Sequence, residues 1–201
     1  MEEQQLTKQQ RRELKRQMKE ARRAGFSRKA RITSILWWGA FLLVLAGLIG
    51  YVVWDILRPL SGTKITTLER SHVPVGEKPT YNSNPPTSGA HYEQTEPWGI
   101  SDRPLVIERL VHNLEHGGIV IYYKCDVKTD KSCEELIAKL KDITQQLMKK
   151  DKKVVLAPNE KIDSKIAATA WGWFDKMEVF DEERIRQFFS DHINRGPERV
   201  L

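Results

Sequence analysis

The sequence predicts a mixed α/β protein of the α+β type, with an N-terminal transmembrane helix followed by a small sheet of three to four strands and about three helices. The first observation behind this prediction is an uncharged apolar run at residues 32–54, which is long enough to cross a bilayer. The second is the order helix, strand, helix, strand, strand, helix in the apolar patterns that follow. The third is the composition, 40% hydrophobic and 30% charged, which is typical of a chain with a folded core.

The positive charge of the chain is confined to its N-terminus. The 201 residues carry a formal net charge of +6. Residues 1–31 hold 11 basic and four acidic side chains, a net charge of +7, so the remaining 170 residues carry −1. A folded domain without a basic surplus lacks the electrostatic footprint of a nucleic-acid-binding protein. The sequence therefore predicts no nucleic-acid partner.

The apolar run is interpreted as an uncleaved signal anchor at residues 32–57. Trp37 and Trp38 stand near one end and Tyr51 and Trp54 near the other, as water–lipid interfaces favour. A buried core helix and a cleaved signal peptide are the alternatives, but the run exceeds the ~7–15 apolar residues of a signal peptide and no A-x-A pattern follows it. Basic residues before the run keep the N-terminus in the cytoplasm, so the rest of the chain is expected outside the cell membrane.

Four regions follow from this interpretation. Residues 1–31 form a basic cytoplasmic tail near anionic lipid headgroups. Residues 32–57 cross the membrane, residues 58–79 form a linker with a short strand at 64–68, and residues 80–201 form an extracytoplasmic domain. A loop at 81–92 is rich in turn-forming residues but also holds two tyrosines and a histidine, so it is expected to be ordered. The elements expected beyond it are a helix at 104–116 with Pro104 in its first position, a strand at 119–123, a helix from 132 to about 150, strands at 154–156 and 165–177, and a helix at 181–193.

Two cysteines lie on the expected outer side of the membrane. Cys125 follows the first predicted strand of the domain, and Cys133 begins the next helix. Because exported proteins meet an oxidising environment, this pair is predicted to form a structural disulfide. A reactive thiol pair is the alternative, although the C-x7-C spacing is not that of a redox motif.

Histidines form the candidate metal site. His112 and His116 are one turn apart on the same face of a predicted helix, which is the spacing that lets two imidazoles hold one metal ion. Glu108 lies one turn earlier on that face, and Glu115 is adjacent. Imidazole ligands suit copper and zinc. A methionine beside the histidines would favour copper, but nothing in the sequence places Met177 there.

The same segment also suggests a hydrolase. His112 to His116 reads H-x-x-E-H, a metallopeptidase pattern in which the glutamate, here Glu115, activates the metal-bound water. Such a site needs a third metal ligand further along the chain. Glu182 and Glu183 are the candidates, on the basis of their distance in the sequence alone. The remaining histidines, His72 in the linker and His192 near the end of a helix, are expected to be solvated.

Several segments resemble a known family. They read NPPTSGAHY at 84–92, HNLEHGG at 112–118, AWG at 170–172 and GPE at 196–198. Over residues 81–198 the chain resembles the domain of unknown function 3105 family of membrane-anchored or exported proteins. Ala90 stands where that family is expected to have proline, which alters only the stiffness of the loop. The resemblance implies no established activity, but it places His91, His112 and His116 inside the family's signature segments.

The sequence thus predicts a single-pass membrane protein whose outer domain binds copper or zinc through His91, His112 and His116. Glu108 or Glu115 would be a fourth ligand or would orient an imidazole. Metal delivery, storage or sensing are the expected roles, with the lipid bilayer as the one partner that the sequence identifies. Two alternatives remain: a metal-dependent hydrolase in which Glu115 is the general base, and a non-catalytic interaction module whose histidines only pin the loop to the core.

Overall fold

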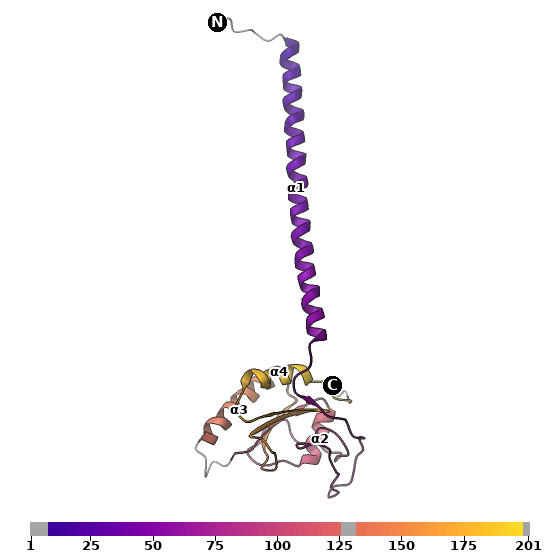
Figure 1. The fold of residues 1–201 in the computed structure, drawn as a ribbon, viewed down its shortest axis with the longest axis vertical. Coiled ribbons are helices and arrows are strands. Elements are labelled where there is room, and N and C mark those ends of the chain that lie inside the picture. The colour runs from indigo at the N-terminus through magenta and orange to yellow at the C-terminus, as the bar shows by residue number, and fades with distance from the viewer. Residues whose placement is uncertain (1–7, 126–131, 199–201) are drawn as a thin grey trace. The chain divides into compact units, whose positions relative to one another are not determined.

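The computed structural model describes residues 8–125 and 132–198, and for residues 8, 24–30 and 32 it describes the backbone alone. The chain divides into two compact units, Met1–Pro59 and Leu60–Leu201. The described residues form four helices and six strands, so the fold is mixed α+β (Figure 1).

The first unit is one long helix, α1 (Lys8–Leu57). Its part from Thr33 to Leu57 is long and apolar enough to cross a membrane, and its large hydrophobic side chains are exposed. A helix of this kind near an N-terminus could serve as a membrane anchor or as a signal sequence.

The second unit is built on a sheet with more strands than the three to four predicted. The order across the sheet is β1-β6-β5-β3-β4-β2. β4 pairs in parallel with both β3 and β2, and the other pairs are antiparallel. The strands are β1 (Thr63–Lys64), β2 (Gly99–Ile100), β3 (Ile119–Tyr123), β4 (Val154–Pro158), β5 (Ile166–Ala170) and β6 (Trp173–Met177).

The additional strands have simple physical reasons. The short strand predicted at 64–68 is wrong beyond Lys64, because β1 ends there, and β2 was not predicted at all. Both are two-residue strands at the edges of the sheet, too short to produce any periodicity in the sequence. The segment predicted as one strand at 165–177 is a hairpin, because Gly172 turns the chain with a φ of +72° that other residues adopt only with strain. The predicted strand at 119–123 is confirmed as β3.

Helices cover both faces of the sheet. Alternate residues of β3 point to opposite faces, and because all five are buried, neither face is open to solvent at this central strand. Ile119 and Ile121 pack with the helices α3 (Ser132–Met148) and α4 (Glu182–His192), whereas Val120 and Tyr122 pack with α2 (Ile107–Glu115). Figure 1 shows α3 and α4 on one side of the sheet and α2 on the other.

The helix ends differ in how well the sequence predicts them. α4 begins after Asp181, whose side chain accepts a hydrogen bond from the Arg184 amide, as expected of an N-cap. α2 begins three residues after Pro104, so the prediction that Pro104 occupies the first helical position is wrong. The chain before α2 is extended at Val106, whose amide donates to the Glu96 carboxylate at 3.3 Å.

The segment predicted as a linker is packed against the domain from Leu60 onward. The Ile65 amide donates to the Gly172 carbonyl at 2.8 Å, and the Leu68 amide donates to Ser88 Oγ at 3.0 Å. The first bond fastens the segment to the turn of the hairpin β5–β6, and the second fastens it to the loop at 81–92. As a result, this segment contributes residues to the domain and, as shown below, one residue to the candidate site.

His192 is buried, so the expectation that it is solvated is wrong. Its side chain is only 2% exposed, and its ring lies 4.8 Å from that of Trp173 and 4.5 Å from that of Phe188, between centroids. Its Nε2 donates to the Ser61 carbonyl at 2.8 Å. The segment that begins at Leu60 thus covers this end of α4, which a pattern confined to the helix does not reveal.

The burial of His192 predicts that the domain loses stability in mild acid. Burial lowers the pKa of His192, partly opposed by the Ser61 carbonyl and Asp191, so the unfolded chain binds this proton more readily. Stability should therefore fall as the pH drops through the ordinary histidine pKa of about 6.5. Denaturation at pH 7.5 and pH 5.5 in the presence of a chelator should show a smaller fall for His192→Asn than for the wild type. Equal falls in the two proteins would contradict this assignment.

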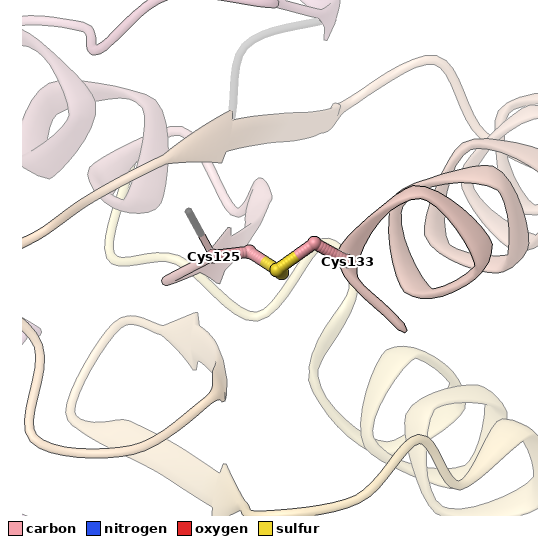
Figure 2. Close-up of a disulfide and its surroundings, with 2 residues drawn as sticks. All are labelled: Cys125 and Cys133. Atoms are coloured by element: carbon pink, nitrogen blue, oxygen red, sulfur yellow. A yellow bond between two sulfur atoms is a disulfide. The ribbon is translucent and has the colours of Figure 1, made fainter. Parts of the chain in front are cut away.

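Cys125, just after β3, and Cys133, in the first turn of α3, are joined by a disulfide, which Figure 2 shows between the strand and the helix. Their Cα atoms are 5.6 Å apart. Residues 126–131 between them lie outside the described part of the chain. Closing a loop of this length stabilises a fold by about 2–3 kcal/mol. The bond fastens the start of the α3 crossover that returns the chain to β4, parallel to β3.

Candidate metal centre

The C-terminal half of α2 is buried although it carries polar side chains. His112, Asn113 and Glu115 are 6%, 0% and 4% exposed. They are carried inside because Leu110 and Leu114, one turn apart, anchor this half of the helix in the core against β3, β4 and β5. Buried polar groups of this kind need partners, and two other segments of the chain supply them.

The first of these segments is the loop at 81–92, which is ordered as predicted. Ser88 Oγ accepts from the Leu68 amide at 3.0 Å, and the Thr87 carbonyl accepts from the Gly172 amide at 3.0 Å. Asn113 holds the chain beyond the loop, because its side chain accepts from the Glu96 amide and donates to the Glu96 carbonyl, both at 2.9 Å. These bonds lay the loop across α2.

The second segment contains His72, which pairs with His91 in an isolated parallel β-bridge. The His91 amide donates to the Ser71 carbonyl, and the Val73 amide donates to the His91 carbonyl, both at 2.9 Å. The His72 ring then lies 5.1 Å from the rings of both His91 and His112, between centroids. Three imidazoles therefore meet from three separate parts of the chain.

We name His72, His91, His112 and Glu115 the inner group. Each residue offers one ligand atom, and the four atoms lie within 4.8 Å of one another. His91, His112 and Glu115 are buried, and His72 is exposed. This set of three imidazoles and one carboxylate is able to hold a metal ion.

Backbone carbonyls orient the two buried imidazoles. His91 Nδ1 donates to the Gly89 carbonyl at 2.8 Å, and His112 Nδ1 donates to the Tyr92 carbonyl at 3.0 Å. In a neutral imidazole this leaves the lone pair on Nε2, which is how metal-binding histidines are usually held. Burial, together with the neighbouring His116 and His91, lowers the pKa of His112 and favours this neutral form.

Glu115 brings negative charge to the free side of these rings. Its Oε2 lies 2.9 Å from His91 Nε2, and its Oε1 lies 3.3 Å from Nη1 of the half-exposed Arg70. Although this distance is short, His91 Nε2 is buried and has no hydrogen-bond partner among the described residues. A lone pair and a carboxylate that face each other at this distance require a cation or a proton between them.

A second set of ligands overlaps the first, and we name it the outer group. It consists of His112, His116 and Glu198, again with ligand atoms within 4.8 Å. His116 is the C-cap of α2, and its ring centroid is 4.4 Å from that of His112. Its Nε2 lies 3.4 Å from Glu198 Oε2. A cavity of about 220 Å³ is lined by Glu198 together with Arg70, Ser71, His72, His91 and Glu115.

The segment that carries Glu198 is docked on the end of α2 by backbone contacts. The Asn194 amide donates to the Gly117 carbonyl at 2.8 Å, and the Glu198 amide donates to the Glu115 carbonyl at 3.1 Å. Gly196 lies so close to α2 that a Cβ there would stand 2.1 Å from the Glu115 carbonyl oxygen. Only glycine permits this approach, which brings the Glu198 carboxylate to His116.

A comparison with family models places these residues in a family. The model described as "Protein of unknown function (DUF3105)" matches residues 72–201, which is more than half of the chain. The chain belongs to the DUF3105 family. No curated protein and no solved structure matches it. Since the DUF3105 match begins at His72, it contains every residue of the inner and outer groups.

The DUF3105 domain brings together some of the predicted site residues and separates others. His91, His112 and Glu115 belong to the inner group, whereas His116 joins His112 in the outer group. Glu108 belongs to neither group. It lies in the first turn of α2, where its charge adds to burial in raising the pKa of Tyr81.

The third ligand suggested for a hydrolase does not reach the site. Glu182 and Glu183 begin α4, which packs on the opposite face of the sheet from α2, and Glu182 pairs with Arg186 at 2.6 Å. The carboxylate that accompanies His112 and His116 is instead Glu198.

Sequence reasoning missed His72 and Glu198 as members of the groups. Glu198 lies in the GPE segment that carried the family resemblance, so that motif contained the signal. His72 stands alone in a segment without periodicity. Its place beside His91 depends on the β-bridge, which only the tertiary fold creates.

Proposed function

We propose that the DUF3105 domain of this chain binds one divalent transition-metal ion through the inner group and holds it at the outer surface of a membrane. The observation that carries the proposal is that His91, His112 and the Glu115 carboxylate converge inside the domain while backbone carbonyls occupy Nδ1 of both imidazoles. In the neutral form, each of these imidazoles then has its lone pair on Nε2. A metal ion satisfies all three groups at once, and His72 completes a four-coordinate set.

Zinc and copper(II) are the ions that best match these ligands. Imidazole nitrogens suit both metals, and a single carboxylate oxygen is a common companion to them. Met177 does not supply a soft thioether ligand, because it packs in the core beneath α3 and α4 and not on the face of α2. The ligand set therefore does not favour copper(I). Arg70 engages Glu115 Oε1, so we expect Glu115 to bind the ion through Oε2 alone.

We further propose that α1 is an uncleaved signal anchor with a cytoplasmic N-terminus. The apolar stretch Thr33–Leu57 and the net charge of +7 on residues 1–31 support this orientation. The basic tail would lie on anionic lipid headgroups, each basic residue near the surface adding about 1 kcal/mol. The metal site would then serve delivery, storage or sensing of the ion outside the cytoplasm.

The alternatives are less well supported. In a hydrolase of the H-x-x-E-H type, Glu115 would have to act on a metal-bound water, yet its two oxygens already face Arg70 and His91. In a purely structural cluster, the histidines would hydrogen-bond to one another. The bond from His112 Nδ1 to the Tyr92 carbonyl does pin the loop to α2, but no hydrogen bond between the described residues uses the buried Nε2 of His91.

Metal analysis of the full chain in detergent tests the proposal. After equilibration with zinc or copper(II) and removal of the excess, the wild type should retain one ion per chain. His91→Ala and His112→Ala should each weaken binding by at least about tenfold, because each removes a ligand. His192→Asn is the matched control, since His192 is the one histidine outside both groups and should leave retention unchanged. A wild type without metal, or equal retention by His112→Ala, would contradict the proposal.

A further inference from the structure

The inner and outer groups share His112, and this sharing has a chemical consequence. His112 Nδ1 donates to the Tyr92 carbonyl, so the imidazole has one lone pair to offer, on Nε2. One lone pair binds one ion at a time. The two groups are therefore alternative coordination sets around a common ligand, and they do not form a site for two ions.

The two sets differ in which ligands solvent reaches: in the inner group His72 alone is exposed, whereas in the outer group Glu198 is exposed and His116 is partly buried. In the inner group, the side chains of His91 and Glu115 are only 1% and 5% exposed. The side chains of His116 and Glu198 are 20% and 49% exposed. The cavity of about 220 Å³ has Glu198 in its lining as well as His72, His91 and Glu115, so the outer carboxylate borders the same space as the inner ligands.

From these observations we infer that the outer group is the transfer site through which a metal ion enters and leaves the inner group. The ion first binds the exposed Glu198 and His116 together with His112. It then keeps His112 while it exchanges His116 and Glu198 for His91, Glu115 and His72. No electron moves, and the ion stays divalent throughout the exchange. This inference rests on the proposed function, because it assigns the route to that same site.

The backbone contacts of the outer group suit a transfer site. Glu198 is held close by the Gly196 approach and by its amide bond to the Glu115 carbonyl, so the carboxylate is fixed near His116 in the folded state. Its side chain nevertheless remains half exposed, and solvent can compete for it. An ion that binds first to an exposed carboxylate and then to buried histidines loses its water ligands a few at a time. This avoids the cost of removing all of its water in a single step.

Exchange kinetics on the full chain in detergent test this inference. Zinc uptake and its release to a chelator are followed by stopped flow for the wild type, Glu198→Gln and His116→Asn. Because the outer ligands are absent from the final bound state, both variants should slow uptake and release alike, by about tenfold, which corresponds to about 1.4 kcal/mol of barrier. The dissociation constant should change by less than about threefold. Glu183→Gln, on the other face of the sheet, is the matched control and should exchange at the wild-type rate.

Each other outcome overturns the inference in a recognisable way. Unchanged rates in both variants would mean that the ion does not pass through the outer group, while the inner site and the proposed function stand. A loss of affinity equal to that of His91→Ala would make His116 and Glu198 ligands of the bound state. Two zinc ions per wild-type chain would show that the groups are separate sites. A wild type that binds no zinc would overturn the proposed function as well.

Discussion

Zinc is expected to stabilise the unit Leu60–Leu201 by about 2.7 kcal/mol when its free concentration is one hundred times the dissociation constant. The reason is linkage: the inner group is assembled from three distant segments, so the unfolded chain lacks the site and binds the ion weakly. Hydrogen–deuterium exchange of the β3 and β5 amides measures this effect without any contribution from α1. A chelator should return the exchange rates to those of the metal-free protein.

The corresponding control is His112→Ala, which removes the shared ligand from both groups. Its metal-free stability should be lower than that of the wild type, and zinc at the same concentration should stabilise it by no more than about 1.4 kcal/mol, since a tenfold weaker site meets zinc at only ten times its dissociation constant. Equal protection by zinc in the variant and the wild type would show that the ion acts elsewhere on the chain, and would count against the inner group.

Asn113→Ala is expected to lower the free energy of unfolding by about 2–6 kcal/mol, more than any surface change. Asn113 is fully buried, and its amide pairs with both the amide and the carbonyl of Glu96 at 2.9 Å. Alanine leaves two buried backbone groups unpaired, each at a cost of about 1–3 kcal/mol. The chain that follows His91 would loosen from α2, so zinc affinity should fall as well. Denaturation and metal titration measure the two effects.

Asn82→Ala is the matched control for this prediction. Asn82 is exposed at its hydrogen bond and donates once, to the Thr66 carbonyl at 2.7 Å, so that water can replace the lost partner. The expected cost is about 0.5–1.5 kcal/mol, with zinc affinity unchanged. If the two variants lost similar stability, the hydrogen bonds of Asn113 to Glu96 would not be what holds the loop to the helix.

Local patterns were sufficient for the elements that are long and periodic. The run of apolar residues predicts the part of α1 from Thr33 to Leu57, and the β-branched run at 119–123 predicts β3. Short elements carry no such pattern. β1 and β2 exist because a two-residue segment lies beside the edge of a sheet, and the hairpin at Gly172 depends on one backbone angle. The strand count was therefore too low.

For the candidate site too, local sequence patterns predict some features and tertiary contacts decide the others. Helical spacing predicts His112 and His116 side by side, which they are with His116 at the C-cap of α2, and the resemblance to DUF3105 segments singles out His91 as well. The sequence by itself thus determined which residue types are available and which helix carries two of them. It also determined the charge asymmetry around the apolar run. Helical spacing and charge asymmetry are both properties of residues that are close together in the sequence.

Only the tertiary structure decided how the histidines are partnered. The β-bridge at His91 brings in His72, and the close approach at Gly196 brings in Glu198, so the predicted trio separates into an inner and an outer group. The tertiary fold also assigns the lone pairs, because the carbonyls that occupy Nδ1 come from other segments of the chain. Contacts between residues far apart in the sequence leave no periodic signal. Because the ligands of this site come from separate segments of the chain, the sequence alone does not reveal their grouping.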